Sequence, residues 1–161
     1  MAAYTNAAYY KTYFFARGVD VSAQTDSAID AALLVSTEYL DDTWDFTGYL
    51  TVTTQAQKWP RSSVYNSDGV LLDSSVVPSK VKDSCCELAY IHQTQTGGLQ
   101  PLFDGQVIRK ETKEMSPFKK SIEYDTNASA TYERYYAKAV KKIQDFIVSA
   151  GSNAAYIQRV I

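Results

Sequence analysis

The segment from Gln57 to Tyr90 constrains the fold most, because it fixes where the chain must turn and where a helix can begin. Pro60 excludes the preceding Trp59 from the α region, so the chain is extended or turning there. Trp59 is then a large apolar anchor at a bend, with an indole N–H that needs a partner if buried. Asp68-Gly69, between two short apolar runs, predicts a tight turn or a short hairpin.

A helix is expected after this turn. Pro78 suits the first helical position, where its missing N–H costs nothing. Beyond it, helical spacing places four residues on one face, namely Val81, Cys85, Leu88 and His92. Gly97-Gly98 can end this helix.

The two cysteines of the chain, Cys85 and Cys86, are adjacent in this helix. Neighbouring helical positions diverge by about 100°, so they cannot share a tetrahedral metal with good geometry. We therefore expect one cysteine packed and the other near the surface. With a single histidine in the chain, no metal site is expected.

Two further helices are predicted before this segment. Asn6 can cap a helix over Ala7–Arg17 with Gly18 as its stop, and its aromatic residues fall on more than one side. A second helix, with Ser27-Ala28-Ile29-Asp30 as its capping box, is expected to run to about Asp42. Asp41-Asp42 is a conceivable paired-carboxylate site, but no other acidic cluster or histidine lies nearby, so the end of the helix is the favoured interpretation.

Composition points to an ordinary globular chain. The 161 residues suffice for one domain with a real core, and 45% are hydrophobic and 21% charged. The net charge of −2 does not by itself favour nucleic acid or an anionic membrane. No apolar run approaches the length of a membrane span, and the first residues lack the pattern of a signal peptide. We therefore expect the protein to make no membrane contact and to be kept in a reducing cytoplasm.

The chain changes character after Pro101. Residues 106–124 alternate and are highly charged, which predicts a β-hairpin that needs a helix surface or neighbouring subunits beside it. Thr51–Thr54 is a candidate for another short extended piece. The hairpin has two interpretations, namely a solvated edge that resists aggregation and a surface facing DNA phosphates or a partner. Its candidate contact residues are Arg109, Lys110, Lys113, Met115, Phe118, Lys119 and Lys120.

The last helix is expected to start at Thr131 and to end at Gly151. Its apolar face holds Tyr132, Tyr136, Ala139, Val140, Ile143, Ile147 and Ala150. Residues 151–161 form a tail with one basic residue and several apolar ones, unlike a solvating tail. We expect it to dock into another protein through Tyr156, Ile157, Arg159, Val160 and Ile161.

Motifs for catalysis are missing. The chain has no glycine-rich phosphate loop and no nucleophile elbow, and its single histidine, His92, lies on an apolar helical face. We therefore expect a non-enzyme without a cofactor. The expected fold class is mainly α, a bundle of about four helices over residues 1–150 with an inserted hairpin and an extended C-terminal tail.

The order of motifs resembles a known family. Lys58-Trp59-Pro60-Arg61, then Asp68-Gly69, then Val77-Pro78 and the helix after it are similar to the head–tail adaptor proteins of tailed bacteriophages. Related sequences are often labelled DnaT-like single-stranded DNA-binding proteins. The resemblance extends upstream through Trp44 and Phe46–Tyr49 to Tyr13–Gly18, and it marks Trp44, Trp59, Pro60, Arg61 and Pro78 as structural anchors.

The resemblance implies a structural protein of the virion, present in the host cytoplasm during assembly. Such adaptors form a ring, usually of twelve subunits, that joins the portal to the tail or to a stopper or nozzle protein, and DNA passes through its channel. Their C-terminal segment reaches into the portal. The alternative is a single-stranded DNA-binding protein of replication, in which tyrosines and the lysines at 109–120 would contact bases and backbone.

Overall fold

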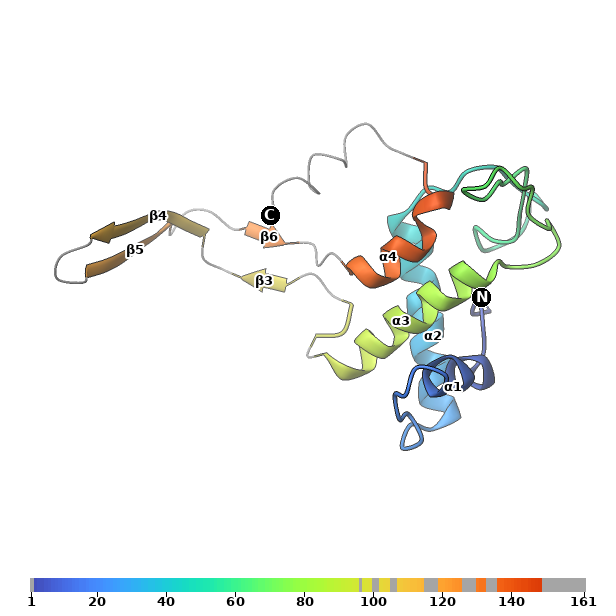
Figure 1. The fold of residues 1–161 in the computed structure, drawn as a ribbon, viewed down its shortest axis with the longest axis horizontal. Coiled ribbons are helices and arrows are strands. Elements are labelled where there is room, and N and C mark those ends of the chain that lie inside the picture. Colours follow the sequence, from blue (N-terminus) through green and yellow to red (C-terminus); the bar gives the residue numbers. More distant parts are fainter. Residues whose placement is uncertain are drawn as a thin grey trace.

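Helix α3 (Ser79–Thr94) is the centre of the fold, because helices on several sides pack against it (Figure 1). The computed structural model describes residues 2–95, 97–99, 102–104, 107–114, 119–125, 130–132 and 136–148. Helix α1 (Ala7–Phe15) and helix α2 (Asp26–Thr43) precede α3, and helix α4 (Ala137–Ile143) with a 3-10 turn (Gln144–Phe146) follows it. The predicted mainly helical architecture with a hairpin is confirmed.

Apolar periodicity accounts for the core that these helices share. Ile29, Leu33 and Leu40 recur at helical spacing along α2, and all three are fully buried. The largest buried side chains come from every helix and from the segment between α2 and α3, namely Tyr10, Phe14, Ile29, Leu33, Leu40, Trp59, Val64, Val81, Leu88, Ile143 and Phe146. No helix among the described residues is long and apolar enough to cross a membrane.

Helix α1 begins as predicted, whereas the cap of α2 differs from the expectation. The Asn6 side chain accepts a hydrogen bond from the Tyr9 backbone N–H at the start of α1. At α2 the cap is Thr25, whose side chain accepts from the Ala28 N–H, and not Ser27. The expected capping residue Asp30 instead accepts from the Ala7 N–H at 2.9 Å, which ties α2 to the start of α1.

The expectation for the two cysteines is wrong, because both are fully buried. The physical reason is the central place of α3: α2 covers one of its sides and α4 another, so adjacent positions can both face the interior. Burial raises the pKa of the Cys85 thiol to about 12. Pro78 is expected at the first helical position, but it occupies the N-cap of α3, and the helix begins one residue later at Ser79.

The segment between α2 and α3 is a lobe of loops. Strand β1 (Tyr49–Leu50) pairs with β2 (Arg61–Ser62), so the extended piece comes just before the expected Thr51–Thr54, which turns instead. The predicted turn at Asp68-Gly69 is confirmed: Tyr65 bridges Leu71, and Gly69 adopts φ of 75°. We call residues 44–78 the loop lobe.

Two strand pairs project from the helices on the side away from the loop lobe (Figure 1). Strand β4 (Val107–Glu114) pairs antiparallel with β5 (Lys119–Asp125), which confirms the predicted hairpin. Strand β3 (Leu102–Asp104) pairs with β6 (Ala130–Tyr132) between that hairpin and the helical body. The β3–β6 pair has no counterpart among the predictions.

The boundaries predicted for the last helix are wrong. Thr131 and Tyr132 lie in β6, because pairing with Phe103 and Leu102 holds them extended, and α4 starts only at Ala137. After Ile143 the chain tightens into the 3-10 turn, and Ile147 then bridges Phe46 antiparallel. Ala139 and Ile143 are fully buried as their periodicity predicts, whereas Ala150 lies outside the described residues.

Candidate functional site

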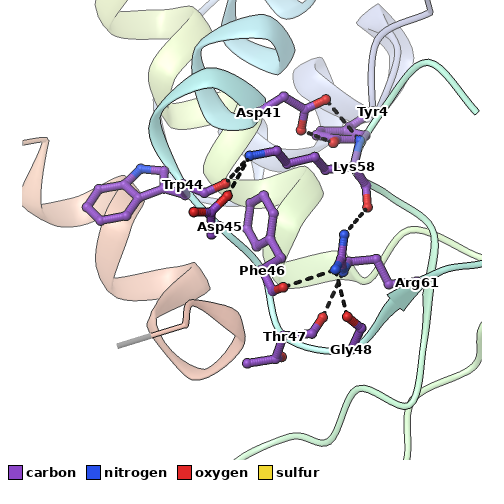
Figure 2. A network of polar contacts seen from close by, with 9 residues as sticks. All are labelled: Tyr4, Asp41, Trp44, Asp45, Phe46, Thr47, Gly48, Lys58 and Arg61. Carbon is purple, nitrogen blue, oxygen red and sulfur yellow. Dashed lines mark hydrogen bonds and ion pairs between the residues drawn. The ribbon is translucent and has the colours of Figure 1, made fainter. Parts of the chain in front are cut away.

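The side chain of Arg61 organises the loop lobe from within (Figure 2). Its guanidinium donates to the backbone carbonyls of Phe46 at 3.0 Å, Thr47 at 2.7 Å, Gly48 at 2.7 Å and Lys58 at 3.2 Å. Arginine suits this role because its planar fork offers five donors in fixed directions. These contacts tie residues 46–48 to residues 58–61 within the lobe.

A buried carboxylate on α2 anchors the same lobe (Figure 2). Asp41 accepts from the Tyr4 hydroxyl and from the Lys58 backbone N–H at 3.1 Å. Burial raises the pKa of the Asp41 carboxyl above its ordinary value, and the two hydrogen bonds oppose that rise. Asp41 is thus engaged by two hydrogen bonds, whereas Asp42 beside it is exposed.

Two tryptophans among the anchors suggested by the resemblance differ in burial. Trp59 is 1% exposed and lies edge-on between the rings of Phe46 and Phe146, with centroid distances of 5.5 and 5.6 Å. Its peptide bond to Pro60 is cis. The Trp59 indole N–H has no hydrogen-bond partner within the described part of the chain, contrary to the expectation. Trp44 is half-buried, and its carbonyl accepts from the Lys58 ammonium at 2.8 Å.

A second polar network lies where α1, α3 and α4 meet. Carboxylates form its inner layer: the Glu87 side chain is 5% exposed and accepts from the Tyr13 hydroxyl. Burial, followed by the bond to Glu87, raises the pKa of Tyr13. Asp83 accepts from the Tyr9 hydroxyl at 2.8 Å, and burial followed by that bond raises the pKa of Tyr9 to about 12.

Cations form the outer layer of this network, and we call them the cation cluster. Its members are Arg17, Lys82, Lys138 and Lys142. Lys138 contacts Glu87 at 2.9 Å, yet its own side chain is 69% exposed. The cluster is a positive outer surface over sunken carboxylates, a layout that suits contact with a polyanion. Lys138 and Lys142 lie four residues apart on α4, so helical i, i+4 spacing is the signal in the sequence that places these two lysines side by side.

The register of the projecting hairpin sorts its lysines onto two faces. Cross-strand partners share a face, and successive pairs alternate between faces. One face pairs Lys110 with Glu123 and Glu114 with Lys119, and we call it the compensated face. The other pairs Glu111 with Ile122 and Lys113 with Lys120, and we call it the lysine face. A shift in register between Ile108 and Lys110 includes Arg109.

Several predicted contact residues fall outside the described residues. They are Met115 and Phe118, between β4 and β5 in the sequence, and Tyr156, Ile157, Arg159, Val160 and Ile161, after residue 148. Within the described ranges, no group of three or more histidine, cysteine, aspartate or glutamate side chains could hold a metal ion. His92 is half-buried and lies close to Gly98: a Cβ atom added to Gly98 would be 2.5 Å from the His92 Nδ1.

Fold and site together define a helical body with a projecting charged hairpin and two polar networks that serve as structural supports. The model of the family described as putative DnaT-like ssDNA binding protein matches residues 1–160. The chain therefore belongs to this family. No match was found among curated proteins or among solved structures.

Proposed function

We propose that the protein binds single-stranded DNA, with the lysine face of its hairpin as a contact for the phosphate backbone. The opposition of Lys113 and Lys120 across the hairpin carries this proposal. Like charges directly opposite each other destabilise a strand pair, whereas a phosphate between them offsets the repulsion. Membership in a family described as ssDNA binding supports the same function.

The net charge of −2 does not oppose this proposal, because binding depends on where the charges lie. The pairs of the lysine face contain two lysines and one glutamate, whereas the pairs of the compensated face contain two lysines and two glutamates. The cation cluster supplies a second positive surface on the helical body. Lys82 is the member without an ion pair within the described ranges, and its ammonium lies 5.8 Å from the centre of the Tyr9 ring.

A matched pair of hairpin variants tests the proposal. Lys113→Gln with Lys120→Gln removes two charges from the lysine face, and Lys110→Gln with Lys119→Gln removes two from the compensated face. Binding of a fluorescent single-stranded oligonucleotide is measured by anisotropy at several salt concentrations. Each lost phosphate contact lowers the slope of log affinity against log salt by about 0.7 for single strands. We expect a loss of about 1.4 for the lysine-face variant.

The helical surface is tested in the same assay. Lys82→Gln is compared with Lys11→Gln, because Lys11 lies on α1 outside the cation cluster and pairs with Asp26. A smaller salt slope for Lys82→Gln alone supports a contribution of the cluster. Equal losses from the two hairpin variants, or binding by the native protein that does not depend on salt, would refute the proposed hairpin contact.

A second candidate function is the phage head–tail connector, and one observation favours it. The hairpin projects away from the helices (Figure 1), and an isolated two-stranded hairpin is marginal in water. Neighbouring copies in a ring would support it, and such a ring, of twelve subunits in the adaptors, has two different contacting patches on each copy. This function places the protein between the portal and a tail, stopper or nozzle protein, with DNA passing the hairpins.

Light scattering distinguishes the two functions. Mass is measured at two protein concentrations, with and without a single-stranded oligonucleotide. A large closed oligomer that ignores the oligonucleotide favours the connector. A small species that gains mass only with oligonucleotide, and loses it in high salt, favours the single-stranded DNA-binding protein.

A further inference from the structure

Exposed apolar side chains gather in the loop lobe. Seven of the nine large apolar side chains that are exposed among the described residues belong to it, namely Tyr49, Leu50, Val52, Tyr65, Val70, Leu71 and Val76. Tyr49 is 72% exposed although it lies in a paired strand. Scattered exposed residues are normal in soluble proteins, whereas a concentration of them marks an interaction surface.

Backbone pairing connects these residues into one region. Tyr49 and Leu50 lie in β1, which pairs with Arg61–Ser62 of β2. Val64 lies two residues beyond β2, and its carbonyl accepts a hydrogen bond from the Leu72 N–H at 2.8 Å. The next residue, Tyr65, bridges Leu71. The apolar residues of β1 and those of the following turn are therefore joined through one short stretch of chain.

The last described residues before the C-terminal segment lie at the root of this lobe. The Val148 N–H donates to the Asp45 carbonyl and the Thr47 N–H to the Phe146 carbonyl, both at 2.8 Å. Tyr49 is three residues from Phe46, which is about 10 Å of extended chain at most. The thirteen residues from 149 to 161 can span about 45 Å, so the lobe is within their reach.

The composition of that segment matches the lobe. Its large side chains are Tyr156, Ile157, Val160 and Ile161, and its one charged side chain is Arg159. In the lobe, the cations Lys58 and Arg61 are engaged by Asp45 and by backbone carbonyls. Asp68 and Asp73 are exposed, so the surface offers carboxylates to Arg159 as well as apolar contacts.

We infer that residues 149–161 cover the apolar surface of the loop lobe in the same chain. A tethered segment meets its site at an effective concentration in the millimolar range, so individually weak apolar contacts suffice to hold it. A partner that takes up the tail would uncover the lobe at the same time. This inference does not rest on the DNA-binding proposal.

Photocrosslinking in the full-length protein tests the inference. Benzoylphenylalanine replaces Tyr65 in the lobe or, as the control, Phe15 on α1, which is 85% exposed but lies outside the lobe. An equal mixture of light and heavy isotope-labelled protein is irradiated, digested and analysed by mass spectrometry. We expect position 65 to crosslink to residues 149–161 within one isotope label and position 15 not to do so. No excess over position 15, or crosslinks that mix the labels, overturns the inference.

Dye binding by full-length variants provides a second readout. Ile157→Asp with Val160→Asp should weaken the apolar contacts and raise the fluorescence of 8-anilinonaphthalene-1-sulfonate, whereas Ala154→Asp, a matched charge in the same segment, should raise it less. Far-ultraviolet circular dichroism confirms that each variant is folded. Equal dye fluorescence in the native protein and in the double variant contradicts coverage of the lobe by these residues.

Discussion

Replacing Trp59 by alanine should destabilise the protein severely. Burial of a tryptophan removes roughly 150–250 Å² from water, which at about 25 cal/mol per Å² corresponds to about 4–6 kcal/mol. Alanine keeps a small part of that area, and measured losses for buried tryptophan or phenylalanine are about 3–5 kcal/mol. Trp59 is 1% exposed and contacts two aromatic rings edge-on, so we expect a loss of about 4 kcal/mol in the free energy of unfolding.

Urea unfolding followed by circular dichroism measures this loss, and a thermal melt should show a midpoint lower by about 8–16 °C. Trp59→Phe retains an aromatic ring in the same place and should cost less. Tyr65→Ala removes an aromatic side chain that is 55% exposed in the same lobe, and it should cost about 0.5 kcal/mol or less. A loss below about 1 kcal/mol for Trp59→Ala would show that Trp59 is not part of the core.

Three further predictions concern buried or half-buried polar groups. In urea titrations, Arg61→Met should lower the free energy of unfolding by about 2–3 kcal/mol, because it leaves carbonyl groups unpaired. Arg61→Lys keeps a donor and should lower the free energy of unfolding by less. Because the pKa of the Asp41 carboxyl is raised, the folded state binds the Asp41 proton more tightly than the unfolded state does. The contribution of this proton to stability is therefore full below the ordinary carboxyl pKa and is lost as pH rises through the folded pKa. Asp41→Asn should flatten that decline when unfolding is measured from the ordinary carboxyl pKa upward, and an unchanged profile contradicts the assignment. Cys85 and Cys86 should react with a thiol reagent only after unfolding, and rapid reaction of the native protein would show that α3 is not covered as described.

The candidate site was only partly predictable from the sequence. Alternation and charge predicted the hairpin, because both are properties of neighbouring residues. The sequence did not decide which lysines share a face, because one register shift near Arg109 sets the pairing of every later residue. Similarly, nothing local indicated that Arg17, Lys82 and Lys138 lie in one cluster, since they come from three separate parts of the chain.

The sequence by itself determined α1, α2 and α3, the turn at Asp68-Gly69 and the hairpin, because helical periodicity, capping and turn chemistry act within a few residues. Only the tertiary structure decided that both cysteines are buried, that Tyr132 is in a strand and that Arg61 ties together four carbonyls. Each of these outcomes depends on a partner distant in sequence. A helix has one buried side or several according to what packs on it, and an apolar residue at helical spacing becomes extended when another strand pairs with it.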